Sequence, residues 1–321
     1  MHRRGAGRAS HGPRAVKVAV LAGGLGGSRF ARALAETIDP EQLTIVGNVG
    51  DDVEIFGLHV SPDLDTILYT LTGRLDEERG WGRKDETWNA LGEAGRLAAG
   101  TWFQLGDRDI GLHLVRTEKL RDGEPLSRVT RDLAAAFGLV PALLPATDDR
   151  LRTWLETPAG DFPFQEWFVG RQHRDEVDAV RFEGAEDARP APGVLEALAG
   201  ADLIAIAPSN PFVSIGPILA VAGIREALEH RSAPAVAVSP LIAGKAVRGP
   251  ADRMLARLAG GTGPKQVTDC YKGLIDALVV DKADADEEAG IRTIVTRTLM
   301  NDADTRRRLA DAVLETAAAL R

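Results

Sequence analysis

Cysteine is almost absent from this chain of 321 residues, because Cys270 is the single one. A lone cysteine excludes a disulfide framework within the chain and a metal site built from several thiolates. Low cysteine use is typical of proteins that work in a reducing cytoplasm. We expect a cytoplasmic protein in which Cys270 is a small core residue.

Long apolar runs are also lacking. The basic stretch at residues 1–15 is followed by an apolar run that is too short for a signal sequence or a membrane span. We therefore expect no membrane segment and interpret residues 1–15 as a disordered basic tail.

Several functional patterns are missing. None of the six histidines forms an H-x-H or H-E-x-x-H pattern, so zinc is not expected. No G-x-S-x-G motif is present, which argues against a covalent serine mechanism. The net charge of −8 argues against a general nucleic-acid binder, which needs a concentrated basic surface. Phosphoryl chemistry, which needs mainly positioning and charge, is compatible with all of these absences.

What the chain does have is enough apolar sequence, 44% of its residues, for a large core. Apolar runs end in glycine or a polar turn at "VKVAVLAGG", "LTIVGNVGDD", "DLIAIAPSN", "PAVAVSP" and "DALVVDKAD". Continuous apolar runs are typical of strands buried on both faces of a parallel sheet. Helical periodicity at 30–36, 215–228 and 303–320 alternates with them. The pattern predicts a Rossmann-like, doubly wound α/β fold with a mostly parallel sheet.

One segment breaks this alternation. Residues 61–137 have a mostly helical pattern that opens on Ser61 and Pro62. We interpret them as a helical insertion that covers the carboxyl edge of the sheet. The following "RTWLETPAGDFPFQEWFVG" predicts a hairpin. Residues 16–321 are expected to form a single catalytic α/β domain.

A glycine-rich loop joins the first strand to its helix. In "AGGLGGSRF", glycines at positions 23, 24, 26 and 27 precede Arg29. The loop matches neither the dinucleotide fingerprint, whose third glycine would fall on Arg29, nor the P-loop, whose lysine is missing. Backbone N–H groups at a helix start, with Arg29 beside them, favour a phosphate ligand. A tight turn without a ligand would explain the same glycines.

Carboxylates follow the second strand. "GNVGDD" contains Asp51 and Asp52, and "SPDLDT" contains Asp63 and Asp65. Carboxylates next to a phosphate repel it unless a cation lies between them, and Mg²⁺ is held by one or two carboxylates plus phosphate oxygens. The pattern predicts Mg²⁺. Turn formation or a helix-start role would explain these residues without a metal.

Two further loops carry polar groups. "LGDRD" brings Arg108 to a helix start, either as part of an acidic cap or as a substrate ligand. "APSNPF" places Ser209 and Asn210 after a buried strand, where their side chains and a following helix start favour an anion or ribose. A proline-rich turn is the alternative explanation.

These motifs together, with "GWGRKDETWNA", "PATDD", "FQEWFVG", "APSNPFVSIGPIL" and "VSPLIAGKAVRGPAD", resemble the 2-phospho-L-lactate transferase family of coenzyme F420 biosynthesis. The resemblance extends from about residue 17 to the C-terminus. It implies a Mg-dependent phosphotransferase that moves a phospho-three-carbon-acid group, 2-phospho-L-lactate or phosphoenolpyruvate, from a guanosine diphosphate-linked donor to the ribityl hydroxyl of the deazaflavin precursor Fo, releasing GMP. It also implies a homodimer that uses small-molecule substrates.

The resemblance assigns roles to residues of this chain. The diphosphate and guanosine would lie near Gly23, Gly24, Gly26, Gly27, Ser209 and Asn210, and Arg29 adds a guanidinium there. The metal would be held by Asp51 and Asp65. Fo would lie near Asp65 and Arg108, and we add Asp63 and Trp88 as candidate Fo contacts. Trp88, Trp81 and Trp102 could form an aromatic wall for the flat ring, with packing inside the insertion as the alternative explanation. Asp65, Arg108 and Asp51 are the candidate catalytic residues. Which carboxylate is the base, and which acid the donor carries, stay open.

Two other functions are weighed. A non-catalytic nucleotide-sugar-binding regulator, similar to gluconeogenesis factors, shares the glycine loop and an Asp-Asp turn, but Asp52 is here followed by Val53, Glu54 and Ile55. An NAD-dependent oxidoreductase would need the missing third glycine and an acidic residue where Asn48 stands.

Overall fold

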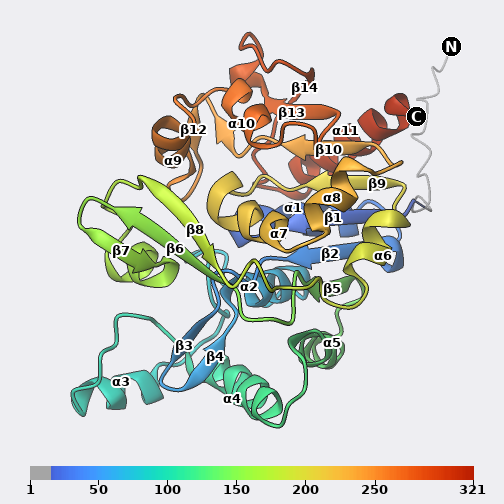
Figure 1. Ribbon diagram of the computed structural model, residues 1–321. Coiled ribbons are helices and arrows are strands. Elements are labelled where there is room, and N and C mark those ends of the chain that lie inside the picture. Colours follow the sequence, from blue (N-terminus) through green and yellow to red (C-terminus); the bar gives the residue numbers. More distant parts are fainter. Residues whose placement is uncertain (1–15) are drawn as a thin grey trace, which may run out of the picture.

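The computed structural model describes residues 16–321, so the basic tail lies outside the described part (Figure 1). A seven-stranded sheet forms its centre, in the order β14-β13-β10-β9-β1-β2-β5. All neighbouring strands in it are parallel. The strands are β1 (Val18–Ala22), β2 (Leu43–Gly47), β5 (Ala142–Pro145), β9 (Leu203–Ile206), β10 (Ala235–Val238), β13 (Ala277–Asp281) and β14 (Arg292–Thr296). The predicted doubly wound α/β fold is confirmed.

The central strands explain why the apolar runs are continuous. Every residue of β1, β9, β10 and β13 is buried. Both faces of these strands are covered, so neither face needs polar side chains. The edge strands β5 and β14 contain exposed positions, and their weaker apolar signal left them out of the predicted strands.

Helices cover both faces of the sheet (Figure 1). On one face α1 (Gly24–Ala35) packs against α11 (Ala303–Leu320). On the other lie α7 (Gly216–Ala220) and α8 (Ile224–Glu229), which pack against each other, with α6 (Val194–Ala199) against α8. Right-handed crossovers require this arrangement, because strand order runs outward from β1 in one direction and from β9 in the other.

The predicted single helix over 215–228 is wrong. The chain forms η3 (Pro211–Ile215) and α7, leaves the helix at Val221 in an extended conformation, and restarts α8 after Gly223. Gly223 has φ +89°, a left-handed conformation that interrupts a helix and favours glycine. The apolar periodicity of the sequence continues through this break because α7 and α8 both present their apolar sides to the same sheet.

Residues 61–137 are helical as expected, and contain α2 (Pro62–Leu71), α3 (Asn89–Arg96), α4 (Asp107–Arg121) and α5 (Leu126–Phe137). A short hairpin, β3 (Val53–Ile55) and β4 (Leu58–Val60), precedes them. The predicted later hairpin is present as β6 (Arg152–Thr157) and β7 (Gly160–Pro163), with β8 (Ala179–Glu183) as a third antiparallel strand.

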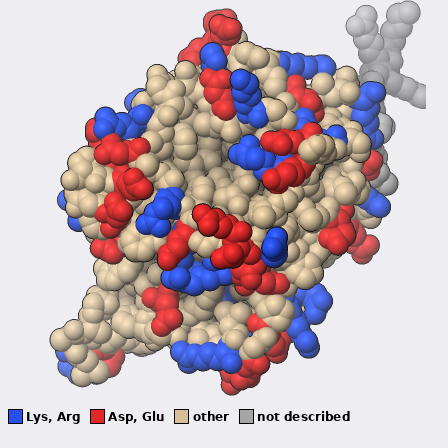
Figure 2. Space-filling model, viewed as in Figure 1, with Lys and Arg blue, Asp and Glu red and all other residues tan. Residues whose placement is uncertain are grey.

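Further elements lie toward β10 and β13: the small ribbon of β11 (Leu241–Ile242) and β12 (Lys245–Ala246), and helices α9 (Ala251–Leu258) and α10 (Pro264–Cys270). In residues 16–321 no helix is both long and apolar enough to cross a membrane. On the face shown in Figure 2, Lys and Arg side chains are interspersed with Asp and Glu rather than gathered into one basic surface.

Candidate functional site

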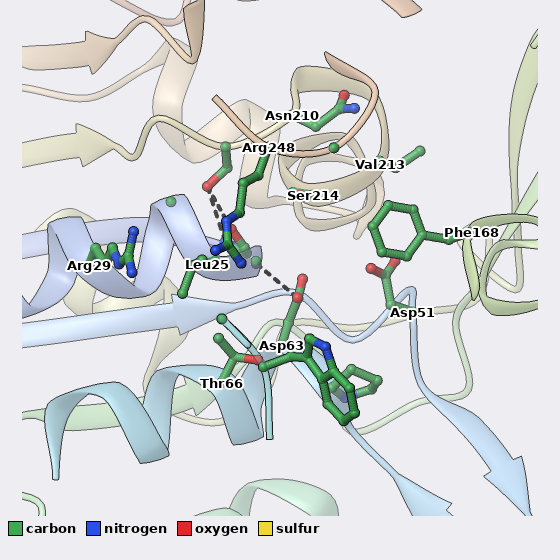
Figure 3. A pocket seen from close by; sticks show the side chains of 18 of the residues that line it. Leu25, Arg29, Asp51, Asp63, Thr66, Phe168, Asn210, Val213, Ser214 and Arg248 are labelled. Atoms are coloured by element: carbon green, nitrogen blue, oxygen red, sulfur yellow. Dashed lines mark hydrogen bonds between the residues drawn. The ribbon is translucent and has the colours of Figure 1, made fainter. Parts of the chain in front are cut away.

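A cavity of about 550 Å³ opens at the carboxyl ends of the central strands. It lies where the strand order reverses, between β1 and β9, which is the usual ligand position in doubly wound sheets. Its lining combines the glycine loop, the insertion, the segment around Phe164 and Phe168, the loops after β9 and β10, and residues 298–300 (Figure 3). The insertion therefore forms one wall of this cavity.

The glycine loop packs tightly against its surroundings. A Cβ atom at Gly23 would lie 2.6 Å from Asp63 Oδ2, and one at Gly27 would lie 2.7 Å from Ser209 Oγ. The Gly24 N–H donates to Asp63 Oδ1 at 2.8 Å, and Ser209 Oγ donates to the Gly23 carbonyl at 2.8 Å. These glycines permit close packing, and Asp63 already occupies a donor at the start of α1. Gly23, Gly24, Gly26, Asp63 and Ser209 line the cavity, whereas Gly27 does not.

Gly26→Ala is expected to destabilise the protein. The new Cβ would lie 2.5 Å from the Pro208 carbonyl oxygen, so the glycine loop and the loop after β9 would have to separate. Overpacking of this kind costs about 1–3 kcal/mol. Urea unfolding measures the change. Gly92→Ala in α3, where no atom lies within 4 Å of the new Cβ, serves as the control. Equal stability of the Gly26→Ala and wild-type proteins would contradict the expectation.

Asp51 and Asp63 form a buried pair of acids in the cavity wall. Burial and repulsion by Asp63 raise the pKa of Asp51 well above its usual range, and burial raises the pKa of Asp63 to about 6. Asn48 Nδ2 donates to Asp63 Oδ2 at 2.9 Å, whereas Asp51 Oδ1 has no hydrogen-bond partner among the described residues. Two buried carboxyls, one with an unpartnered oxygen, fit a ligand that brings a cation or a proton.

Asp65 has a different environment. Arg116 Nη1 donates to Asp65 Oδ2 at 2.9 Å, and Arg116 Nη2 donates to Oδ1. Both side chains are buried, so this is an ion pair shielded from water. Arg116 Nη1 also donates to Nδ1 of His113 at 3.3 Å, and burial lowers the pKa of His113 to about 4. His113 is therefore a neutral, buried residue whose ring lines the cavity.

A Mg²⁺ ion at this site would need oxygen atoms from its substrate. No group of three or more His, Cys, Asp or Glu side chains within residues 16–321 is arranged to hold a metal. One or two carboxylates with phosphate oxygens are an ordinary Mg²⁺ environment, and the unpartnered oxygen of Asp51 fits it. Asp65 fits less directly, because a metal would share each of its oxygens with Arg116.

Arg108 and Trp88 are not among the residues that line the cavity. Arg108 is exposed, and its backbone N–H donates to Glu86 Oε2 at 2.9 Å. Trp88 packs edge-on against Trp81, with ring centroids 6.1 Å apart. The structure thus brings Asp51, Asp63 and Asp65 together with Ser209 and Asn210 but leaves these two outside.

The aromatic residues of the lining come from the insertion and from a second part of the chain. Trp81 lines the cavity, while Trp102 packs edge-on against Phe103, which does. Phe164 and Phe168 also line it and stack at 5.2 Å between ring centroids. Their motif, "FQEWFVG", contributed to the resemblance but received no role from the sequence.

Other polar residues of the site were also missed. Asp109 lines the cavity and accepts a hydrogen bond from Tyr69 Oη at 2.7 Å, and burial raises the pKa of Asp109 to about 6.

Two predicted residues have partners within the protein. Arg29 lines the cavity as expected, but Glu77 lies 2.9 Å away as its ion-pair partner. Asn210 Oδ1 accepts from the Phe212 N–H at 2.9 Å, which is the turn role considered as its alternative. The i, i+3 spacing of His113 and Arg116 places these two side chains on one face of α4. This spacing does not reveal that Asp65 is the ion-pair partner of Arg116.

The model of the family described as 2-phospho-L-lactate transferase CofD matches residues 18–317. A phosphoenolpyruvate transferase of Streptomyces griseus is 44% identical over 317 residues, covering 95% of this chain and 100% of that protein. Another from Streptomyces coelicolor is 43% identical, covering 95% and 99%. A third from Mycobacterium sp. strain KMS is 42% identical, covering 89% and 94%.

The fold has a solved counterpart. The crystal structure of a Bacillus halodurans protein of the UPF0052 family has a TM-score of 0.62 to this chain at 19% identity, covering 94% of this chain and 100% of that one. A likeness at this identity concerns the fold alone. The family model and the relatives span almost the whole described chain, and they confirm the resemblance that the motifs carried: this chain belongs to the 2-phospho-L-lactate transferase family.

Proposed function

We propose that this chain transfers a phospho-three-carbon-acid group from a guanosine diphosphate-linked donor to the ribityl hydroxyl of Fo, in coenzyme F420 biosynthesis. The relatives' names favour phosphoenolpyruvate as the acid. The observation that carries the proposal is the cavity at the strand-order reversal, where the glycine loop faces a buried pair of acids. A diphosphate at such a position is a common arrangement in doubly wound folds.

The reaction balances as a displacement at phosphorus. The Fo hydroxyl oxygen forms a bond to the phosphorus next to the acid, the bond from that phosphorus to the GMP oxygen breaks, and the hydroxyl proton leaves to a base. Mg²⁺, when bound, would neutralise charge on the diphosphate. Asp51 is the best candidate to hold Mg²⁺ or accept the proton, because its oxygen is buried and unpartnered. Asp65 is held in one orientation by Arg116, which suits positioning the acceptor.

A direct assay tests this function. The purified chain is mixed with Fo, Mg²⁺ and the guanylylated forms of phosphoenolpyruvate, 2-phospho-L-lactate and phosphoglycerate, and GMP and the phosphorylated deazaflavin are followed by mass spectrometry. We expect both products in equal amounts, with the phosphoenolpyruvate donor used fastest. Absence of GMP with every donor would refute the transferase and favour the nucleotide-binding regulator. A control without Mg²⁺ tests the metal requirement.

The cytoplasmic location and the homodimer stay predictions. Light scattering of the purified chain tests the homodimer, with a mass of about twice 34.3 kDa as the expected result.

A further inference from the structure

Two loops from distant parts of the sequence meet at the cavity. One is the insertion loop at Gly80, Trp81 and Gly82, and the other contains Val247, Arg248 and Gly249 between β12 and α9. Arg248 Nη1 donates to the Arg79 carbonyl oxygen at 2.9 Å, which connects the two loops. In Figure 3 the Arg248 side chain reaches from its loop into the cavity.

The insertion side of this connection is firmly held. The Arg79 guanidinium lies over the rings of both Trp81 and Trp88, 5.2 Å and 5.0 Å from their centroids. It also pairs with Asp76 at 3.0 Å and donates to the Arg83 carbonyl at 2.8 Å. The Arg79 carbonyl is therefore fixed by its own side chain, and it can hold Arg248 in one position.

The lack of a side chain at Gly80 leaves room for the Arg248 guanidinium. Gly80 has φ +76°, and a Cβ atom there would overlap Nη1 of Arg248. The guanidinium thus lies directly against the backbone of the insertion loop, at a place where any other residue would displace it.

Arg248 differs from the other cavity arginine in its charge balance. Arg29 has Glu77 as its ion-pair partner, whereas no carboxylate within residues 16–321 lies within 4.0 Å of Arg248. A guanidinium has five N–H donors, and the Arg79 carbonyl accepts from one nitrogen. The cavity wall also carries Asp51, Asp63, Asp65 and Asp109, which repel an anionic ligand.

We propose that Arg248 binds an anionic group of the donor and, through its bond to Arg79, closes the two loops over it. The group is a phosphate or carboxylate, both of which match the planar guanidinium. This inference rests on the proposed function, because it requires a donor that is an anion. The motif that contains Arg248, "VSPLIAGKAVRGPAD", does not by itself indicate a role for this residue.

The test compares Arg248→Ala, Arg248→Lys and wild type in the transferase assay. Hydrogen bonds to charged groups contribute about 1.5–3 kcal/mol, so Arg248→Ala is expected to raise the KM for the donor by about 10- to 100-fold. The KM for Fo should change less than about twofold, since the proposal places Arg248 on the donor and not on Fo. Arg248→Lys should recover part of the loss, because it keeps the charge and loses the planar fork.

Two more variants sharpen the test. Gly80→Ala keeps the arginine at position 248 but displaces its guanidinium. Like Arg248→Ala, it should therefore raise the KM for the donor. Lys245→Ala removes a nearby cation, in β12, that does not line the cavity, and it should leave both KM values unchanged. Thermal unfolding confirms that each variant is folded.

Binding measurements separate this inference from the proposed function. Calorimetry with GMP, GDP and the donor needs no turnover. Weaker GDP and donor binding by Arg248→Ala assigns the guanidinium to the terminal phosphate, and weaker binding of the donor alone assigns it to the acid's carboxylate. Unchanged affinity for GDP and donor would overturn the inference even if the wild type is active. A wild type that binds GDP through Arg248 but releases no GMP would overturn only the function.

Discussion

The Asp51→Asn protein is expected to release GMP about 10² to 10⁴ times more slowly than the wild type. Asp51 is buried in the cavity wall, and its Oδ1 has no partner among the described residues. An uncompensated buried carboxylate is costly for folding, and the donor complex would give it a cation or a proton. Asparagine has a similar shape but can neither accept the proton nor neutralise a metal.

The stability of this variant distinguishes a functional from a structural role. The fold raises the pKa of Asp51 above its unfolded value, so its ionised form opposes folding once the pH exceeds that value. At neutral pH the Asp51→Asn protein should therefore unfold at a temperature no lower than the wild type. Asp122→Asn, at an exposed position outside the cavity, is the control for activity. Turnover within about threefold of the wild type would remove Asp51 from the mechanism.

The Asp65→Ala protein is expected to lose about 3–5 kcal/mol of stability as well as its turnover. Arg116 is buried, and its guanidinium would remain without the carboxylate that accepts two of its hydrogen bonds. A buried unpaired charge is far more costly than a missing surface ion pair. Urea unfolding measures the loss, and an Asp65→Ala protein as stable as the wild type would show that the ion pair is not formed.

A double variant separates the two effects. Asp65→Ala with Arg116→Met removes both charges and leaves an apolar side chain of similar length in place of the arginine. We expect it to recover most of the lost stability, because replacing a whole buried ion pair is often neutral. Turnover should stay low, since the carboxylate that faces the cavity is still missing. Recovery of turnover together with stability would show that Asp65 acts only through the fold.

The candidate site was only partly accessible from the sequence. Asp51, Asp63, Asp65, Ser209 and Asn210 follow strand ends, and parallel strands bring their carboxyl ends to one edge, so their convergence could be predicted. Arg108 and Trp88, both in the insertion, were also predicted to lie at the site, but they do not line the cavity. Their positions depend on how the insertion folds over the sheet, which no local pattern encodes.

The fold class and the family follow from the amino-acid sequence without the structure. Continuous apolar runs can be buried only in strands covered on both faces, and their alternation with helical segments leaves few other architectures. The electrostatic environment of each acid, in contrast, depends on contacts made in the folded protein. Asp63 and Asp65 are two residues apart on α2, yet one contacts the glycine loop and the other the buried Arg116 of α4. Partners, burial and repulsion arise between elements distant in the chain, and they separate residues that look alike in the sequence.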